Sequence, residues 1–181
     1  MRKLISPLTG LATLVALCFS YVVKADAQSA QYYYIRRLVD GDTYELYETD
    51  GDGKYIQIRL ACADTPETRR NNSKSENANA NQLYWGRIAE ARVTQLINQS
   101  GGLIWFNPNG GKSYNRAVGD VYLTNGTLVQ STLAAEGLAM LDRSYGNCNS
   151  LEEQAQASAQ WYRRGVWGDS NFIAPWLFRD K

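Results

Sequence analysis

Two acidic clusters near the start of the chain carry the side chains best suited to chemistry. The first, at residues 39–43, contains Asp42, and the second, at residues 63–67, contains Asp64 and Glu67. Carboxylates that lie close together repel one another unless a cation neutralises them, and oxygen ligands are those that Ca²⁺ and Mg²⁺ prefer. The clusters therefore indicate a site for a hard divalent cation. The competing interpretation is a pair of ordinary turns, which also favour aspartate and glycine.

Two arginines can add positive charge to such a site. Arg59 lies near the end of the segment between the clusters, and Arg116 follows a turn-rich stretch. Guanidinium groups bind phosphate oxygens in a bidentate manner and oppose charge that develops in a transition state. Two of them beside a metal ion are what a phosphodiester substrate would require. For either arginine alone, a plain surface ion pair is the competing interpretation.

The chain contains no histidine, which excludes several mechanisms. Ser-His-Asp and Cys-His arrangements are impossible, as are phosphohistidine intermediates. If the chain acts on phosphates, a carboxylate must handle the proton, and Glu67 is the candidate base acting on water. Residues 50–53 resemble the start of a calcium-binding loop, but a hairpin turn explains them better because no glutamate follows at the required position.

The elements that must position these residues can be read from hydrophobic periodicity. Strand patterns cover residues 32–39, 43–47, 55–61, 103–106 and 118–123, and helix patterns cover residues 83–97, 128–136 and 151–164. Residues 68–82 are polar and asparagine-rich, which is typical of a mobile surface loop, and residues 107–115 are rich in turn formers. Five strands with one helix between the third and fourth predict an α+β protein: an OB-fold, with a five-stranded Greek-key β-barrel and three α-helices.

Residues 1–27 have the layout of a secretory signal peptide, with a basic start, an apolar stretch and a small-x-small cleavage site near Ala27. An uncleaved membrane anchor is the competing interpretation. We expect residues 28–181 to form a single domain with its core at about 33–167. The protein is then secreted, periplasmic or otherwise in the cell envelope, without stable membrane association, and a monomer by default.

Charge and cysteine content narrow the possible partners. Of the 19 basic and 18 acidic residues, three basic and one acidic lie within residues 1–27, so the remainder carries 16 and 17 and is not basic. Any binding of nucleic acid must therefore be local, because non-specific coating requires a positive excess. The two remaining cysteines, Cys62 and Cys148, form a possible disulfide in an exported protein. Two unpaired buried thiols are the alternative.

An ordered set of short motifs resembles the staphylococcal nuclease (thermonuclease) family. The motifs are Val-Asp-Gly-Asp-Thr (39–43), Arg-Leu (59–60), Asp-Thr-Pro-Glu (64–67), Tyr-Asn-Arg (114–116), Gly-Leu-Ala (137–139) and Val-Trp (166–167). Each motif is weak alone, but their order along residues 33–167 is specific. The resemblance implies an OB-fold and Ca²⁺-dependent hydrolysis of DNA and RNA.

The resemblance also implies how the metal and the proton are handled. Asp42 and Asp64 would bind Ca²⁺ through their carboxylates, and the carbonyl of Thr65 would assist. Glu67 would act as the general base or orient the attacking water.

For the substrate, the resemblance implies that Arg59 and Arg116 hold the scissile phosphate and stabilise the transition state. Tyr114 and Tyr145 match positions that contact nucleotide in the family. A bridge between Cys62 and Cys148 would have no counterpart in the best-known member, and would tie the loop after Tyr145 to the third strand.

Three positions depart from the family pattern. Asn115 stands where glycine is usual, Ser113 where a phosphate-contacting lysine is expected, and Arg143 where a nucleotide-facing tyrosine is expected. These changes bear on affinity and base preference, while the acids and both arginines are retained. The sequence thus predicts an exported Ca²⁺-dependent endonuclease, a phosphodiester hydrolase. The alternatives are an inactive nucleic-acid-binding OB-fold module and an exported structural domain that calcium stabilises.

Overall fold

The computed structural model describes residues 30–47 and 54–179. The expected signal peptide at residues 1–27 and the expected hairpin turn at residues 50–53 lie outside this part of the chain. None of the helices in the described part has the length and apolar character needed to cross a membrane.

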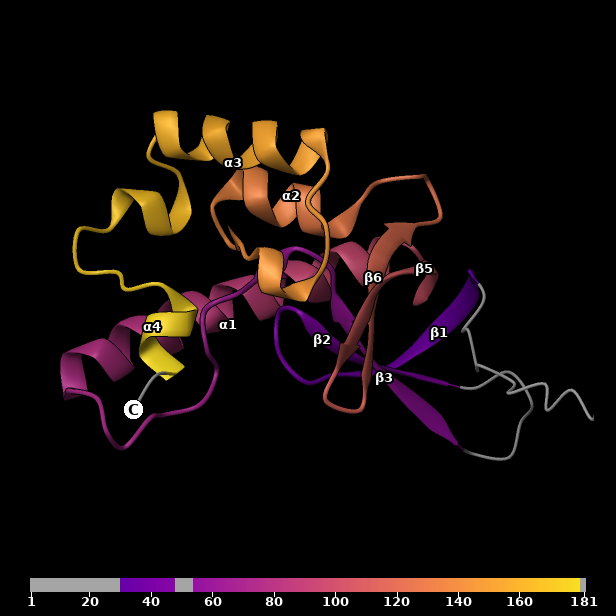
Figure 1. Ribbon diagram of the computed structural model, residues 1–181, viewed down its shortest axis with the longest axis horizontal. Helices are drawn as coiled ribbons and strands as arrows, with labels where there is room; N and C mark the ends of the chain where they lie inside the picture. Colours follow the sequence, from indigo (N-terminus) through magenta and orange to yellow (C-terminus); the bar gives the residue numbers. More distant parts are fainter. Residues whose placement is uncertain (1–29, 48–53, 180–181) are drawn as a thin grey trace, which may run out of the picture.

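Five strands close into a barrel (Figure 1). They are β1 (Gln31–Leu38), β2 (Thr43–Tyr47), β3 (Tyr55–Leu60), β5 (Leu103–Ser113) and β6 (Arg116–Leu123). Their order around the barrel is β1-β2-β3-β6-β5. Neighbours are antiparallel except β3 and β6, which run parallel. The predicted α+β OB-fold is confirmed, and closure leaves the barrel without a free sheet edge.

The alternating pattern of the strands fills the barrel. Leu46, Ile58, Leu60 and Phe106 are fully buried in the core, as expected for side chains that point inward at every second position. Arg59 points away from Ile58 and Leu60, yet it is only 4% exposed. The outer face of β3 is therefore covered at Arg59 by other parts of the chain.

The described part of the chain also contains four helices, one more than the sequence predicts. They are α1 (Glu76–Gln99), α2 (Val129–Glu136), α3 (Ser150–Trp161) and α4 (Pro175–Arg179). Ala89 and Val93 of α1 and Leu133 of α2 are buried in the barrel's core. The unpredicted helix α4 follows a segment that is hydrogen-bonded to α1, from Gln82 Nε2 to the Ile173 carbonyl, and its Phe178 is 1% exposed. The tail thus packs back on the body of the domain.

Helix α1 begins before its apolar pattern does. The prediction of a mobile loop at residues 68–82 is therefore wrong from Glu76 onward. The side chain of Ser75 caps the helix by accepting the backbone N–H three residues later, which stabilises a helix start. Asn79 and Gln82, on the inner side of the first two turns, are buried and hydrogen-bonded. A pattern built on apolar residues cannot detect a helix face that buries amides.

Strand β5 is also longer than predicted, because most of the turn-rich stretch at residues 107–115 belongs to it. A bulge in its second half lets glycine and asparagine stay within the strand. The chain reverses at Tyr114, whose φ is +58°. Arg116 consequently opens β6 at the tip of the hairpin.

A second, two-stranded sheet and a disulfide cover the end of β3. Strand β4 (Ala63–Asp64) pairs with β7 (Met140–Leu141), and short 3₁₀ helices follow at Arg143–Tyr145 and Gly165–Gly168. Cys62 and Cys148 form the expected disulfide, with their Cα atoms 5.1 Å apart. The Cys62 N–H also donates to the carbonyl of Tyr145 at 2.9 Å. The segment that carries Tyr145 is therefore held against β3.

Candidate active site

The three predicted acids and Arg59 meet at one end of the barrel. Asp42 and Asp64 are 2% and 0% exposed, whereas the side chain of Glu67 is 24% exposed. Both aspartates bind the same guanidinium group. Arg59 Nη1 donates to Asp42 Oδ1 at 2.5 Å, and Arg59 Nη2 donates to Asp64 Oδ1 at 2.7 Å. The convergence of these carboxylates is what the strand order requires, since β1, β2 and β3 are neighbours.

Asp42 is oriented by the other acidic segment as well as by Arg59. Its Oδ2 accepts the backbone N–H of Thr65 at 2.9 Å and the Thr65 hydroxyl at 3.2 Å. A Cβ atom added to Gly41 would come within 2.9 Å of the Thr65 hydroxyl, so the bend approaches this closely because residue 41 is glycine. The two clusters that the sequence separates are thus one hydrogen-bonded unit.

Arg116 reaches the same unit through Thr43. Its Nη1 donates to Thr43 Oγ1 at 3.1 Å, and Thr43 Oγ1 donates to Asp42 Oδ1 at 2.9 Å. The other side of its guanidinium group contacts Ser113, with Nη2 donating to the hydroxyl at 3.0 Å. Both predicted arginines are therefore linked to Asp42. The Nε of Arg59 is buried and has no hydrogen-bond partner in the described part of the chain.

A third arginine, which sequence reasoning missed, enters the site from α4. Arg179 Nη2 donates to Asp64 Oδ2 at 2.6 Å, while Nη1 donates to Asp64 Oδ1 at 2.9 Å and to Glu67 Oε1 at 2.6 Å. Arg179 and Asp64 are 115 positions apart in the sequence, so no local spacing signals the contact. The apolar residues of the tail, such as Trp176 and Phe178, indicate that it packs on the domain, but they do not indicate where Arg179 goes.

Burial raises the pKa of all three carboxyl groups. The pKa of Asp42 rises to about 6, chiefly through burial and then through the charge of Asp40, while the charge of Arg59 opposes the shift. Burial also raises the pKa of Asp64 and of Glu67, and in both cases the hydrogen bond from Arg179 works against it. Additional positive charge beside these groups would favour their ionised forms.

The donor chemistry fits a hard cation. Buried carboxylate oxygens next to a backbone segment suit Ca²⁺ or Mg²⁺ rather than zinc or copper. Within residues 30–47 and 54–179, however, no three acidic or cysteine side chains are arranged as a ready set of metal ligands. The carboxylates are directed instead at Arg59 and Arg179, whose guanidinium groups supply the neutralising charge.

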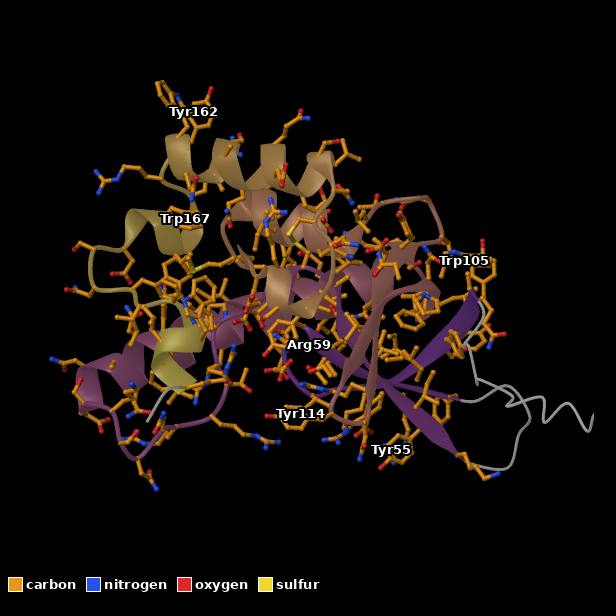
Figure 2. All side chains as sticks on the ribbon, in the orientation of Figure 1. Tyr55, Arg59, Trp105, Tyr114, Tyr162 and Trp167 are labelled. Carbon is orange, nitrogen blue, oxygen red and sulfur yellow. A yellow bond between two sulfur atoms is a disulfide. The ribbon has the colours of Figure 1, made fainter. Side chains whose placement is uncertain are left out.

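The two predicted nucleotide-contacting tyrosines flank a pocket next to the acids. The pocket has a volume of about 280 Å³, and Tyr114, Tyr145 and Val118 are among its lining residues. Arg59 stacks on the ring of Tyr145, with 3.7 Å between its Cζ and the ring centroid. Tyr114 is 90% exposed, with its ring centroid 5.9 Å from the Cζ of Arg116. Figure 2 shows Arg59 and Tyr114 in the same central region of the molecule.

The departures from the family pattern can also be placed. Ser113 accepts a hydrogen bond from Arg116, Asn115 lies in the turn between β5 and β6, and Arg143 forms an exposed ion pair with Glu153. A larger groove of about 700 Å³ runs between β7 and α3, and the three acids are not among its lining residues. The smaller pocket is the one connected to the acids, because its lining residues Tyr145 and Ser113 contact Arg59 and Arg116.

The chain is similar in sequence to several known proteins. Residues 57–169 match the family model described as "Staphylococcal nuclease homologue". The chain is 30% identical over 141 residues to a thermonuclease of Staphylococcus hyicus, with 77% of each chain covered. It is 25% identical over 188 residues to a micrococcal nuclease of Shigella flexneri, with 99% of this chain and 95% of the relative covered. It is also 25% identical over 169 residues to an uncharacterized endonuclease of Escherichia coli, with 93% and 95% covered.

Proposed function

The chain belongs to the staphylococcal nuclease family and is a hydrolase of phosphodiester bonds, and we propose that it is exported and cleaves DNA and RNA with Ca²⁺. One observation carries the proposal: two buried aspartates, a partly exposed glutamate and two arginines meet beside a pocket that two tyrosines flank. The acids suit a divalent cation, and the arginines suit the phosphate of a nucleic acid.

Asp42, Asp64 and the carbonyl of Thr65 are the proposed ligands of Ca²⁺. The cation, when bound, would polarise the phosphate and make a nearby water more acidic. Asp42 is suited to this role because its hydrogen bonds from Thr65 fix its orientation. An oriented, desolvated carboxylate loses less freedom on binding a cation than an exposed one.

Glu67 is the proposed general base. Its carboxyl group is close to Asp64, through their shared partner Arg179, and its partial exposure leaves it open to water. Burial raises its pKa, and a base with a pKa nearer neutrality takes a proton from water more effectively.

Arg59 and Arg116 are proposed to hold the scissile phosphate. The unpartnered Nε of Arg59 and the partly buried guanidinium group of Arg116 offer donors to its non-bridging oxygens. Such donors contribute most when negative charge builds up on those oxygens. Tyr114 and Tyr145 would contact the adjoining nucleotide, since aromatic rings stack on bases of any sequence.

Export is proposed from the expected signal peptide and is supported by the disulfide. Cys62 and Cys148 are bridged, and disulfides persist in oxidising compartments. The alternative from the sequence, an inactive nucleic-acid-binding module, is disfavoured because all three acids and both arginines come together at the site.

A cleavage assay tests the proposal. The purified protein should degrade DNA and RNA with Ca²⁺ and lose this activity in a chelator. We expect Glu67→Gln to lower the turnover by about 10²–10⁴-fold and Arg116→Ala by about 10²–10³-fold. Arg164→Gln is the matched control, because that guanidinium group contacts the Ala135 carbonyl and the Tyr162 ring, and Tyr162 lies far from Arg59 (Figure 2).

Two results would count against the proposal. No Ca²⁺-dependent cleavage by the wild-type protein would reject the calcium-dependent mechanism. Undiminished cleavage by Glu67→Gln or Arg116→Ala would instead reject the assignment of the catalytic residues.

A further inference from the structure

The C-terminal helix places a cation of the protein's own on the proposed calcium ligands. Both carboxylate oxygens of Asp64 accept hydrogen bonds from Arg179, and Oδ1 also accepts one from Arg59. The same guanidinium group of Arg179 engages Glu67. In this arrangement both oxygens of Asp64 are engaged by guanidinium groups, and three of the carboxylate's roughly four lone-pair sites accept hydrogen bonds. A metal ion would have to compete with Arg179 for this carboxylate.

Arg179 is held in place by the packing of the tail. Phe178 is 1% exposed, and its carbonyl accepts a hydrogen bond from Asn71 Nδ2 at 2.6 Å. Gln82 joins the tail to the acidic segment: its Nε2 donates to the Ile173 carbonyl at 2.7 Å, and its Oε1 accepts the Glu67 N–H at 3.0 Å. The backbone that leads to Arg179 is therefore held in place by these contacts.

The charges at the site favour either Arg179 or a divalent cation beside Arg59, but not both together. Asp42, Asp64 and Glu67 carry three negative charges when ionised, and Arg59 and Arg179 carry two positive charges. A divalent ion entering beside both arginines would leave the site positively charged and would meet the guanidinium group of Arg179 at the same oxygens. Like charges at such short range in a buried site repel strongly.

We propose that Arg179 is an intramolecular competitor of the divalent cation, which occupies Asp64 and Glu67 in the metal-free protein and leaves them when the cation binds. This inference rests on the proposed function, since it assumes that Asp64 is a calcium ligand. It also couples two events, because the departure of Arg179 frees Glu67 from its ion pair. The base thus becomes available when the cation is in place.

The direct test is the Ca²⁺ affinity of Arg179→Gln, measured by titration calorimetry on the purified protein without nucleic acid. If the docked position of Arg179 is favoured about tenfold over the undocked one, the dissociation constant of Ca²⁺ should be about tenfold lower for the variant than for wild type. Arg179→Lys, which keeps the charge but loses the bidentate geometry, should have an intermediate affinity. The control Arg164→Gln should bind Ca²⁺ as the wild-type protein does.

Thermal unfolding gives a second readout. In a chelator, Arg179→Gln should melt below the wild-type protein, because Asp64 and Glu67 lose a partner. The rise in melting temperature on adding Ca²⁺ should be larger for Arg179→Gln than for wild type, since the stabilisation grows with the logarithm of the cation concentration divided by its dissociation constant.

The possible failures are distinguishable. If the wild-type protein binds Ca²⁺ and cleaves nucleic acid, but Arg179→Gln binds Ca²⁺ with equal or weaker affinity, the competitor role is overturned and the proposed function stands. If neither protein binds Ca²⁺, both proposals are overturned. If Arg179→Gln does not fold, an unchanged or weaker affinity of Arg179→Lys overturns the competitor role in the same way.

Discussion

Arg59 shows how one side chain can serve both the fold and the chemistry. It is nearly fully buried, binds both aspartates and stacks on Tyr145. A buried carboxylate is costly unless it is paired, so the fold itself depends on this cation. Its remaining donor, Nε, has no partner in the described part of the chain. The same arginine therefore neutralises both aspartates and, under the proposed function, is one of the two that hold the phosphate.

Glu152 is a buried acid that lies outside the active site. It forms a capping box with Asn149 at the start of α3, in which its Oε2 accepts the Asn149 N–H at 2.7 Å. Its Oε1 is buried without a hydrogen-bond partner in the described part of the chain. Burial raises the pKa of Glu152 from 4.5 to about 7. The folded protein therefore holds a proton at this position in a pH range in which the unfolded chain has released it.

This shift predicts the pH dependence of stability. Between pH 4.5 and about 7 the folded state binds more protons than the unfolded state, so the free energy of unfolding falls as pH rises through this range and levels off above it. Glu152→Gln keeps the capping box and should remove this decline. Urea unfolding at pH 5 and pH 8 should show the variant gaining on the order of 1–3 kcal/mol over wild type at the higher pH. An equal difference at both pH values would contradict this.

At the scale of elements, the two links that cover the end of β3 are the main addition to a plain barrel. One is the sheet of β4 and β7, and the other is the bridge between Cys62 and Cys148, which are 86 positions apart. Together they place Tyr145 beneath the guanidinium group of Arg59. The bridge thus holds Tyr145, a residue of the proposed substrate pocket, in addition to joining the two segments that contain the cysteines.

Removing the bridge should cost stability. We expect Cys62→Ala with Cys148→Ala to lower the free energy of unfolding by about 2–5 kcal/mol, because a long loop in the unfolded chain is no longer closed. Guanidinium chloride unfolding of the double variant and of wild type, both at neutral pH, measures the difference. Wild type treated with a reductant should unfold like the double variant. A change below about 0.5 kcal/mol would show that the unfolded chain gains little freedom.

The elements divide into those that local pattern predicts and those that it does not. The strands of the barrel followed from alternation, as in Ile58 and Leu60, because an inward side chain recurs at every second residue. The first turns of α1 did not, since Asn79 and Gln82 bury amides where the pattern expects apolar residues. The meeting of the acids with Arg59 could be predicted, because these residues lie on or next to adjoining strands and in neighbouring motifs. Arg179 could not be foreseen, because its contact depends on how the tail docks on Asn71 and Gln82.

At the scale of the whole molecule, the chain is not basic, although its expected substrate is a polyanion. Residues 28–181 carry 16 basic and 17 acidic residues, so long-range attraction to nucleic acid is weak. The positive charge proposed to meet the phosphate comes from Arg59 and Arg116. Binding should therefore depend on a few local contacts and on the cation rather than on a broad basic surface.

The salt dependence of binding measures this directly. For the slow variant Glu67→Gln at fixed Ca²⁺, the logarithm of the affinity for duplex DNA should fall with the logarithm of NaCl concentration with a slope of about −1. This corresponds to one neutralised phosphate, the one that both arginines hold, at about −0.9. Fluorescence anisotropy of a labelled duplex gives the slope. A slope of about −6 or steeper would mean that many more basic residues contact the backbone.

The parallel pairing of β3 and β6 ties the assembly of the site to the topology of the barrel. Ile58 lies opposite Ala117, and this register brings the strand of Arg59 beside the strand that Arg116 opens. Parallel pairing between distant segments forms slowly, because the intervening chain must first be ordered. During refolding, helical content should therefore return before nuclease activity does. Closure of the barrel and the return of nuclease activity should therefore occur at the same rate.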